Sequence, residues 1–153
     1  RLSAIFISTF HICTNMKIML AGSFHFADKL IEMKKQLVSA GHEVLHTDDL
    51  ETVANIPEIK QNFDDELQQC IEHDVIRDAF SKIESCDALF VCNYDKNGVE
   101  GYLGTSVLME IAVAYHCNKK IFLLKDFDKE QGYGLEIAVI NPVVIHGDLS
   151  KLQ

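Results

Sequence analysis

Ala88-Leu89-Phe90-Val91-Cys92 (ALFVC) is the stretch that decides the fold class of this 153-residue chain. Five apolar residues follow one another, with Asp87 before them and the turn-forming residues 93–98 (NYDKNG) after them. An uninterrupted apolar run of this length predicts a strand that is buried on both faces, which is typical of a parallel sheet covered by helices.

Segments on both sides of this strand alternate as such a sheet requires. Further strands are expected at residues 17–21, 43–46, 121–124 and 143–145. Helices are expected at residues 26–37, 75–85, 104–115 and 135–140. In the second helix, Ile76, Phe80 and Ile83 are expected on one face, with Val75 and Ala79 beside them. The sequence therefore predicts one doubly wound α/β domain, flavodoxin-like or Rossmann-like, with about five parallel strands and helices on both faces.

The first fifteen residues are expected to lie outside this domain. Residues 16–22 (MKIMLAG) read as an initiator methionine followed at once by the first strand. Residues 1–15 are interrupted by Ser, Thr and His and are too short to cross a bilayer. We interpret residues 1–15 as an extension and residues 16–153 as the domain. The alternative is an additional edge strand at residues 4–9.

The charge of the chain restricts the partners that it can have. Fourteen Lys and Arg stand against 23 Asp and Glu, which makes the net charge −9. Nucleic acid polymers and anionic membrane surfaces attract Lys and Arg, so neither is expected as a partner. A small phosphorylated ligand stays compatible with this charge, because backbone N–H groups can hold a phosphate.

The five cysteines favour a reducing, cytoplasmic location. Their number is odd, no C-x-x-C pair occurs, and Cys86 and Cys92 lie in apolar runs. Free and mostly buried thiols are therefore expected, not disulfides or a zinc site. His42 and His46 stand at alternate positions without clustered carboxylates, so no metal is predicted. No cofactor is expected either, since neither G-x-G-x-x-G nor G-x-x-x-x-G-K-[ST] occurs.

Chemistry is expected at the carboxyl ends of the strands, where open parallel sheets bind their ligands. The loop at residues 93–104 (NYDKNGVEGYLG) follows the central strand, holds three glycines and leads into a helix that starts with Thr105 and Ser106. The free N–H groups of that helix start favour a phosphate. The alternative is that the glycines only form turns and that Thr105 only caps the helix.

Glu110 is the sharpest single candidate in the sequence. It lies between Met109 and Ile111 in an otherwise apolar helix, about two turns from the helix start and near the expected site. A buried carboxylate is costly unless it is paired or used. The alternative, which composition favours, is a partly exposed glutamate on the helix surface.

A wider pattern surrounds this glutamate. Asp87 opens an apolar strand, a polar loop and a glycine-rich turn follow, and residues 110–114 (EIAVA) lie in the next helix. Residues 83–124 thereby resemble the nucleoside 2-deoxyribosyltransferase-like superfamily, which includes deoxyribosyltransferases and 2′-deoxynucleoside 5′-phosphate N-hydrolases. Residues 20–23 (LAGS) look like the first strand and Gly-Ser turn of that family, so the resemblance covers most of residues 16–145.

The resemblance implies an activity and assigns roles. Glu110 would attack the anomeric carbon of a deoxyribose and expel the base, and water or a second base would complete the reaction. A second acid should protonate the leaving base. The family's carboxylate for that position is replaced here by Ala79, so the neighbouring Asp78, turned by about 100° on the helix, becomes the candidate. A homodimer or larger homo-oligomer is also implied.

Two further departures from the family pattern occur, and the first of them favours the hydrolase over the transferase. Gly104 stands where the family has a substrate-binding Asp or Ser, and Thr105 or Ser106 can replace only a phosphate-binding Ser. The family's aromatic hydroxyl near the first turn is replaced by Phe24 and Phe26, on which a base can stack. The candidate substrate-binding residues are Gly22, Ser23, Phe24, Asp87, Asn93, Asp95, Gly98, Gly104, Thr105 and Ser106.

The expected substrate is a small nucleotide or nucleoside. Residues 93–118 carry Asp95, Glu100 and Glu110 against Lys96 alone, so backbone N–H groups and hydroxyls would have to hold a phosphate there. This charge balance favours a weakly held monophosphate over a triphosphate. Two alternatives stay open: a non-catalytic module that binds a nucleotide, and an α/β interaction domain without a small ligand.

Overall fold

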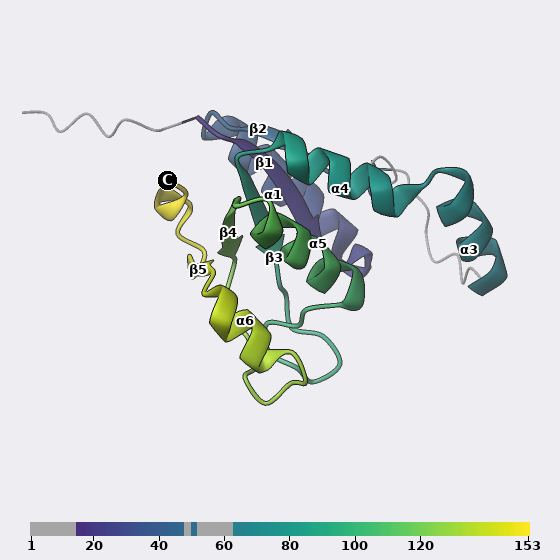
Figure 1. Cartoon of the computed structure of the whole chain (residues 1–153). Helices are drawn as coiled ribbons and strands as arrows, with labels where there is room; N and C mark the ends of the chain where they lie inside the picture. Colours follow the sequence, from purple (N-terminus) through teal and green to yellow (C-terminus); the bar gives the residue numbers. More distant parts are fainter. Residues whose placement is uncertain (1–14, 48–49, 52–62) are drawn as a thin grey trace, which may run out of the picture.

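The computed structural model describes residues 15–47, 50–51 and 63–153 (Figure 1). Apart from Asn15, the expected extension at residues 1–15 and its alternative strand at residues 4–9 lie outside the described residues. So does Cys13, one of the five cysteines.

Five strands form one sheet in which all pairs are parallel. The strands are β1 (Lys17–Gly22), β2 (Glu43–Leu45), β3 (Ala88–Cys92), β4 (Lys120–Leu123) and β5 (Val143–Val144). Their order in the sheet is β2-β1-β3-β4-β5, the flavodoxin-like doubly wound order. The central strand β3 is buried along its whole length. The predicted fold class is confirmed, and each strand boundary lies within one residue of its expected position.

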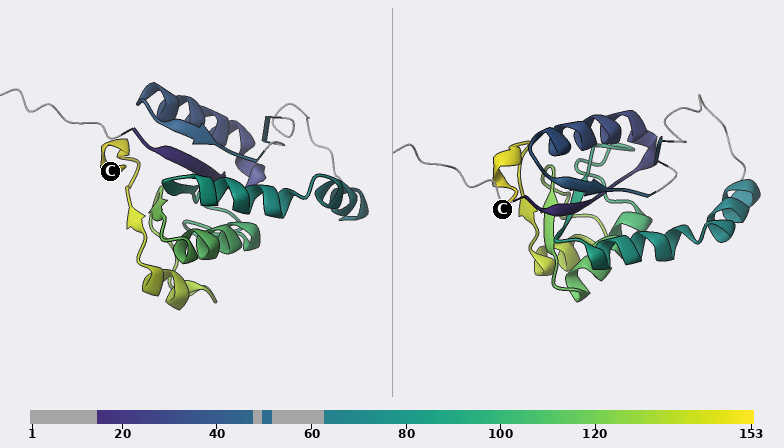
Figure 2. Two further views of the ribbon diagram at one scale, coloured as in Figure 1. Left: turned by 45° about the horizontal axis from the view of Figure 1, so that its top comes forward. Right: turned by 90° about the horizontal axis from the view of Figure 1, so that it is seen from above.

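Helices cover both faces of this sheet (Figure 2). One face packs against α1 (Ala27–Ser39), with the short turns η1 (Phe24–Phe26) and η2 (Leu149–Lys151) beside it. The other face packs against α4 (Val75–Ser85), α5 (Thr105–His116) and α6 (Gly134–Ile140). A further helix, α3 (Phe63–Glu72), precedes α4 and extends beyond the sheet (Figure 1).

Successive strand residues point to opposite faces and so divide the core into two clusters. In β3, Leu89 and Val91 pack toward α4 and α5, whereas Phe90 and Cys92 pack toward α1. Both clusters are closed because helices lie on both sides, which is why β3 carries no polar residue. The apolar run at residues 88–92 is therefore continuous because helices cover both faces of this strand.

The apolar side of α4 is not buried along its whole length. Ala79 and Ile83 are buried in the seam against α5, whereas Ile76 is 51% exposed and Phe80 is half-buried. Ile76 precedes Ile83 by seven positions, about two turns, so both lie on the same side of α4. Its exposure therefore reflects its place in the first turn of α4, before the stretch that packs on the core.

Two observations concern the state of the thiols and the hydropathy of the helices. Cys70, Cys86, Cys92 and Cys117 are free; Cys86 and Cys92 are buried, whereas Cys70 is exposed. No helix among the described residues is both long and apolar enough to cross a membrane.

Candidate functional site

The carboxyl ends of β1 and β3 form the switch point of the sheet, where the order of the strands changes direction. Gly22 stands opposite Cys92 in the register, so the turn after β1 and the loop after β3 start side by side. A Cβ atom on Gly22 would stand 2.8 Å from Leu30 Cδ2 and 3.2 Å from the carbonyl oxygen of Cys92. A side chain at this position would therefore displace the end of Leu30 and crowd the backbone of β3.

Glu110 lies on α5, the helix that follows the loop after β3, and is buried. It is 9% exposed, and its carboxylate makes no hydrogen bond or ion pair with any residue that the structure describes. Burial raises the pKa of Glu110 to about 7. The alternative of a glutamate on the helix surface is wrong, because α5 turns this position toward the protein interior together with Val107, Ile111 and Ala114.

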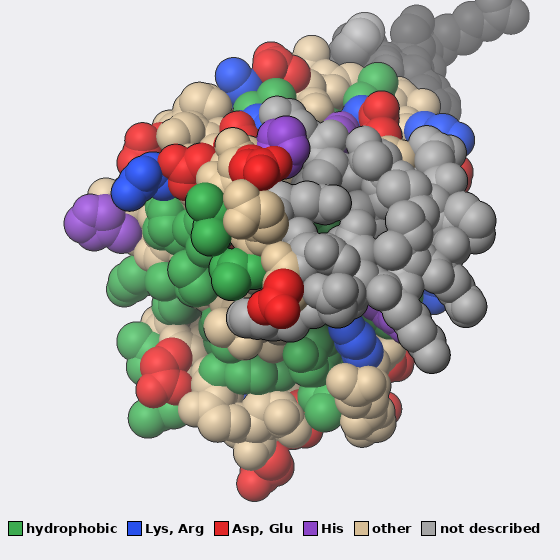
Figure 3. Space-filling model, turned by 90° about the vertical axis from the view of Figure 1, so that its right-hand side faces the viewer, with side chains coloured by type: hydrophobic (Ala, Val, Ile, Leu, Met, Phe, Trp, Pro, Cys, Tyr) green, Lys and Arg blue, Asp and Glu red, His purple; other side chains and the backbone are tan. Residues whose placement is uncertain are grey.

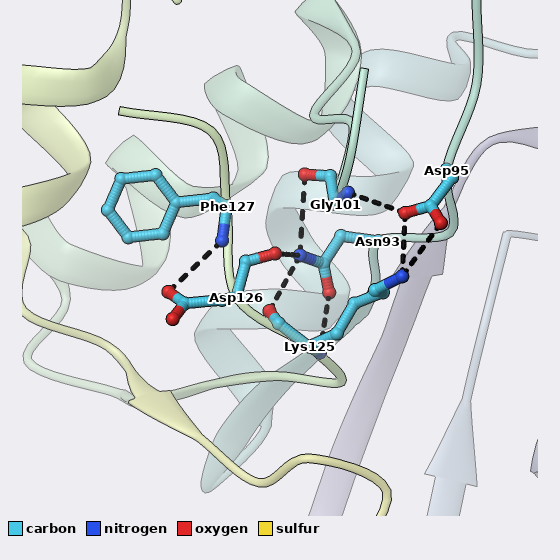
Figure 4. A network of polar contacts seen from close by, with 6 residues as sticks. All are labelled: Asn93, Asp95, Gly101, Lys125, Asp126 and Phe127. Atoms are coloured by element: carbon cyan, nitrogen blue, oxygen red, sulfur yellow. Dashed lines mark hydrogen bonds and ion pairs between the residues drawn. The ribbon is translucent and has the colours of Figure 1, made fainter. Parts of the chain in front are cut away.

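Asn93, the first residue after β3, fastens its loop to the loop after β4 (Figure 4). Its Nδ2 donates hydrogen bonds to the carbonyl oxygens of Lys125 at 2.8 Å and Asp126 at 3.2 Å, and its Oδ1 accepts one from Lys125 N at 3.1 Å. The side chain is 1% exposed. The Asn93 amide group thus bonds to backbone atoms and holds the two loops together.

Asp95 makes a second link between the same loops (Figure 4). It accepts a hydrogen bond from Gly101 N at 2.8 Å and pairs with the Lys125 ammonium at 2.7 Å. The hydrogen bond from Lys125 and then the one from Gly101 lower the pKa of Asp95. Its charge is therefore neutralised by a residue that lies 30 positions later in the chain.

Lys96 reaches across the switch point to the turn after β1. Its Nζ donates a hydrogen bond to Ser23 Oγ at 3.1 Å, although the two residues are 73 positions apart. The same ammonium lies 5.6 Å from the centre of the Tyr102 ring. Ser23 was a candidate from the sequence; Lys96 was counted only as a charge, because nothing in the chain order connects it with Ser23.

An aromatic cluster makes another contact between the two loops. The rings of Phe26 and Tyr94 meet edge to face with centres 5.2 Å apart, and the Lys29 ammonium lies 5.2 Å and 4.9 Å from the two ring centres. Burial raises the pKa of Tyr94 to about 12, so its hydroxyl stays protonated. The Tyr94 ring thus joins the loop after β3 to η1, while its hydroxyl interacts with the Cys92 side chain. Phe24 is half-buried and packs on the core beside α1.

The remaining candidates are not all brought together. Gly104, Thr105 and Ser106 form the start of α5, where Thr105 and Ser106 are exposed. Asp87 lies at the amino ends of β1 and β3, away from the switch point, where its Oδ2 accepts a hydrogen bond from Lys17 N at 2.7 Å. Asp78 pairs with Lys82 on its own helix at 2.6 Å, and no contact joins it to Glu110 within the described part of the chain.

Glu110 lines neither of two hollows that lie near the surface of the described residues. One, of about 320 Å³, is lined by Gly98, Glu100, Lys125, Asp126, Phe127 and Asp128. Its three carboxylates against one ammonium disfavour an anion. The other, of about 460 Å³, lies at the amino ends of β4 and β5, away from the switch point. Among the described residues, no group of three or more His, Cys, Asp and Glu side chains could hold a metal ion.

No family model matches this chain, and no curated protein sequence matches it. The resemblance to the deoxyribosyltransferase-like superfamily therefore depends on the quoted residues and motifs alone.

Proposed function

We propose that this protein cleaves the N-glycosidic bond of a nucleoside or deoxynucleoside 5′-monophosphate and releases the free base, with water or a second base as acceptor. The observation that carries the proposal is the buried Glu110 carboxylate, which has no partner among the described residues. It stands on the helix that starts at the switch point, where ligands of such sheets bind. A buried carboxylate without a partner costs stability, so a role in chemistry is a reason for its presence.

Glu110 suits nucleophilic attack on an anomeric carbon. In its ionised form, one carboxylate oxygen forms a bond to this carbon while the C–N bond breaks and its electron pair leaves with the base. Water then attacks the glycosyl ester and returns the carboxylate, or a second base does so in a transfer reaction. Burial strengthens the nucleophile because it removes the water that would solvate the carboxylate. With a pKa of about 7, Glu110 is ionised in about half of the molecules at neutral pH.

The leaving base needs a proton, and the candidate acid Asp78 has another partner. Asp78 is bound to Lys82, and the neighbouring position is the buried Ala79. This observation favours a second candidate function, a nucleotide-binding module of the same fold that does not cleave its ligand. Such a module needs the loops at the switch point but no acid.

The deciding experiment measures base release. The protein is incubated with a panel of deoxy- and ribonucleoside 5′-monophosphates, and free base is separated by chromatography. Glu110→Gln should abolish release, while Glu136→Gln, at an exposed position on α6, should leave it unchanged. Release that persists in Glu110→Gln would exclude the nucleophile. Binding without release would favour the non-catalytic module, and the absence of binding would favour an interaction domain without a small ligand.

A homodimer is part of the proposal. Its support is the apolar surface on the side that carries α3, where hydrophobic side chains gather over one half of the view in Figure 3. Among the described side chains of α3 and the adjoining start of α4, Leu67, Ile71 and Ile76 are exposed. Grouped exposed apolar residues are typical of interfaces between chains.

A further inference from the structure

Lys96 has a fixed place at the switch point because a tight turn holds its backbone. Lys96 N donates a hydrogen bond to Val99 O at 3.1 Å, and Val99 N donates one to Lys96 O at 3.0 Å. Between them, Asn97 and Gly98 both have positive φ, 54° and 76°. This is the two-residue Asn-Gly turn that closes a hairpin, and it directs the Lys96 side chain from a rigid base.

The ammonium of Lys96 has no carboxylate partner among the residues that the structure describes. Its contacts are the Ser23 hydroxyl at 3.1 Å and the face of the Tyr102 ring at 5.6 Å. By contrast, the nearby Lys125 is neutralised by Asp95. An ammonium has three N–H donors, and Ser23 uses one of them. Two N–H donors of Lys96 therefore have no acceptor among the described residues, in a chain whose net charge is −9.

We propose that Lys96 and Ser23 bind the phosphate of the substrate and make the site select a nucleoside 5′-monophosphate over the free nucleoside. This inference rests on the proposed function, which it deepens by naming the group that is recognised. A phosphate monoester carries a charge of about −1.5 to −2 at neutral pH and presents three acceptor oxygens. Ser23 accepts a hydrogen bond from Lys96, so its own O–H stays available to donate to one of these oxygens.

The position of Tyr102 connects this pair with the helix that carries Glu110. A Cβ atom on Gly104 would stand 3.4 Å from Tyr102 Cε1, so the ring lies against the residue that begins α5. Glu110 follows about one and a half turns further along that helix. Lys96 and Glu110 thus belong to one continuous segment, in which the loop after β3 leads directly into α5. One ammonium and one hydroxyl suit a single phosphate group.

The test is a binding comparison that does not depend on catalysis. Four deoxynucleoside 5′-monophosphates (dAMP, dGMP, dCMP and dTMP) and the four corresponding nucleosides are titrated calorimetrically into the wild type, Lys96→Gln and Lys96→Arg. Lys35→Gln, an exposed position on α1, serves as the control. Lys96→Gln should weaken monophosphate binding about tenfold, the effect of one charge-assisted hydrogen bond, without changing nucleoside binding. Lys96→Arg should keep most of the affinity, and inorganic phosphate should compete in the wild type and in Lys96→Arg but not in Lys96→Gln.

Equal losses for monophosphates and nucleosides in Lys96→Gln, or no loss for either, would overturn the inference, and so would a wild type that binds no monophosphate. The two proposals can fail separately. If base release depends on Glu110 but Lys96→Gln keeps the monophosphate preference, the phosphate site is refuted and the proposed function stands. If Lys96 controls monophosphate binding and no base is released, the catalytic proposal is refuted and the phosphate site stands.

Discussion

Lys125 Nζ lies 2.7 Å from Asp95 Oδ1, so a residue that follows β4 neutralises a residue that follows β3. The same oxygen of Asp95 accepts the hydrogen bond from Gly101 N at 2.8 Å. The buried Asn93 side chain also donates hydrogen bonds to the carbonyl oxygens of Lys125 and Asp126. The loops after β3 and β4 are therefore joined by one buried amide and by one exposed ion pair. The loop from which Lys96 extends is built on this base.

Removal of the Lys125 ammonium should raise the pKa of Asp95. The hydrogen bond from Lys125 is the largest cause of the lowered pKa, and the hydrogen bond from Gly101 N remains when it is lost. In Lys125→Gln, the pKa of Asp95 should therefore move up toward, but not reach, its ordinary value. A titration of the Asp95 carboxyl carbon by NMR measures this, with Lys129→Gln as control; an unchanged pKa would show that the pair does not form in solution.

Gly101→Ala should be far more damaging than Gly98→Ala. Both glycines have positive φ, 56° and 76°, so both substitutions strain the backbone. A Cβ atom at position 101 would stand 1.8 Å from the carbonyl oxygen of Asp126, whereas nothing lies within 4 Å of one at position 98. We expect a loss in the free energy of unfolding of about 3 kcal/mol or more for Gly101→Ala and about 1 kcal/mol for Gly98→Ala. Urea denaturation of the two variants compares them directly, and equal losses would contradict the close packing of the two loops.

Glu110→Gln should make the protein more stable at alkaline pH. Burial raises the pKa of Glu110 from 4.5 to about 7, so the folded state holds a proton that the unfolded state has released between these pH values. Stability from this group is therefore complete below pH 4.5 and is lost as pH rises to 7, by about 3 kcal/mol. The neutral amide of the variant carries no such loss. Denaturation at pH 5 and pH 8 tests this, and an equal pH dependence of both proteins would mean that Glu110 is solvated.

Ile71→Asp should dissociate the proposed homodimer. Ile71 is 62% exposed on α3, and a charge placed in an interface is not solvated. Val38→Asp is the matched control, because Val38 is 52% exposed on α1, which covers the opposite face of the sheet. Light scattering after gel filtration should show a dimer for the wild type and the control and a monomer for Ile71→Asp. A monomeric wild type at all concentrations would refute the dimer.

Prediction from the sequence succeeded where one residue and its neighbours decide the outcome. The apolar run at residues 88–92 needs no distant information, and neither does the turn at Asn97 and Gly98. It could not show that Ile76 is exposed although it lies on the same side of α4 as the buried Ile83, and it favoured an exposed Glu110 because most glutamates are exposed. The burial of a helix residue is set by the partner of the helix and not by its own periodicity alone.

The charge of the site shows the same division. Counted along the chain, residues 93–118 hold three carboxylates and one lysine, which led to the expectation that only backbone and hydroxyl groups could hold a phosphate. In the fold, Lys125 neutralises Asp95, and Lys29 and Lys96 lie over aromatic rings beside the switch point. A count along the chain omits the cations that parallel strands bring to the same edge of the sheet.

The sequence by itself determined the α/β class and the five strands, because hydrophobic periodicity and turn residues act over a few positions. Only the tertiary structure decided that Glu110 is buried, that Asp87 lies at the amino ends of the strands and that Lys96 donates a hydrogen bond to Ser23. The reason is physical: desolvation and charge pairing depend on distances in space, and two residues 73 positions apart are joined only when the strands that carry them pair.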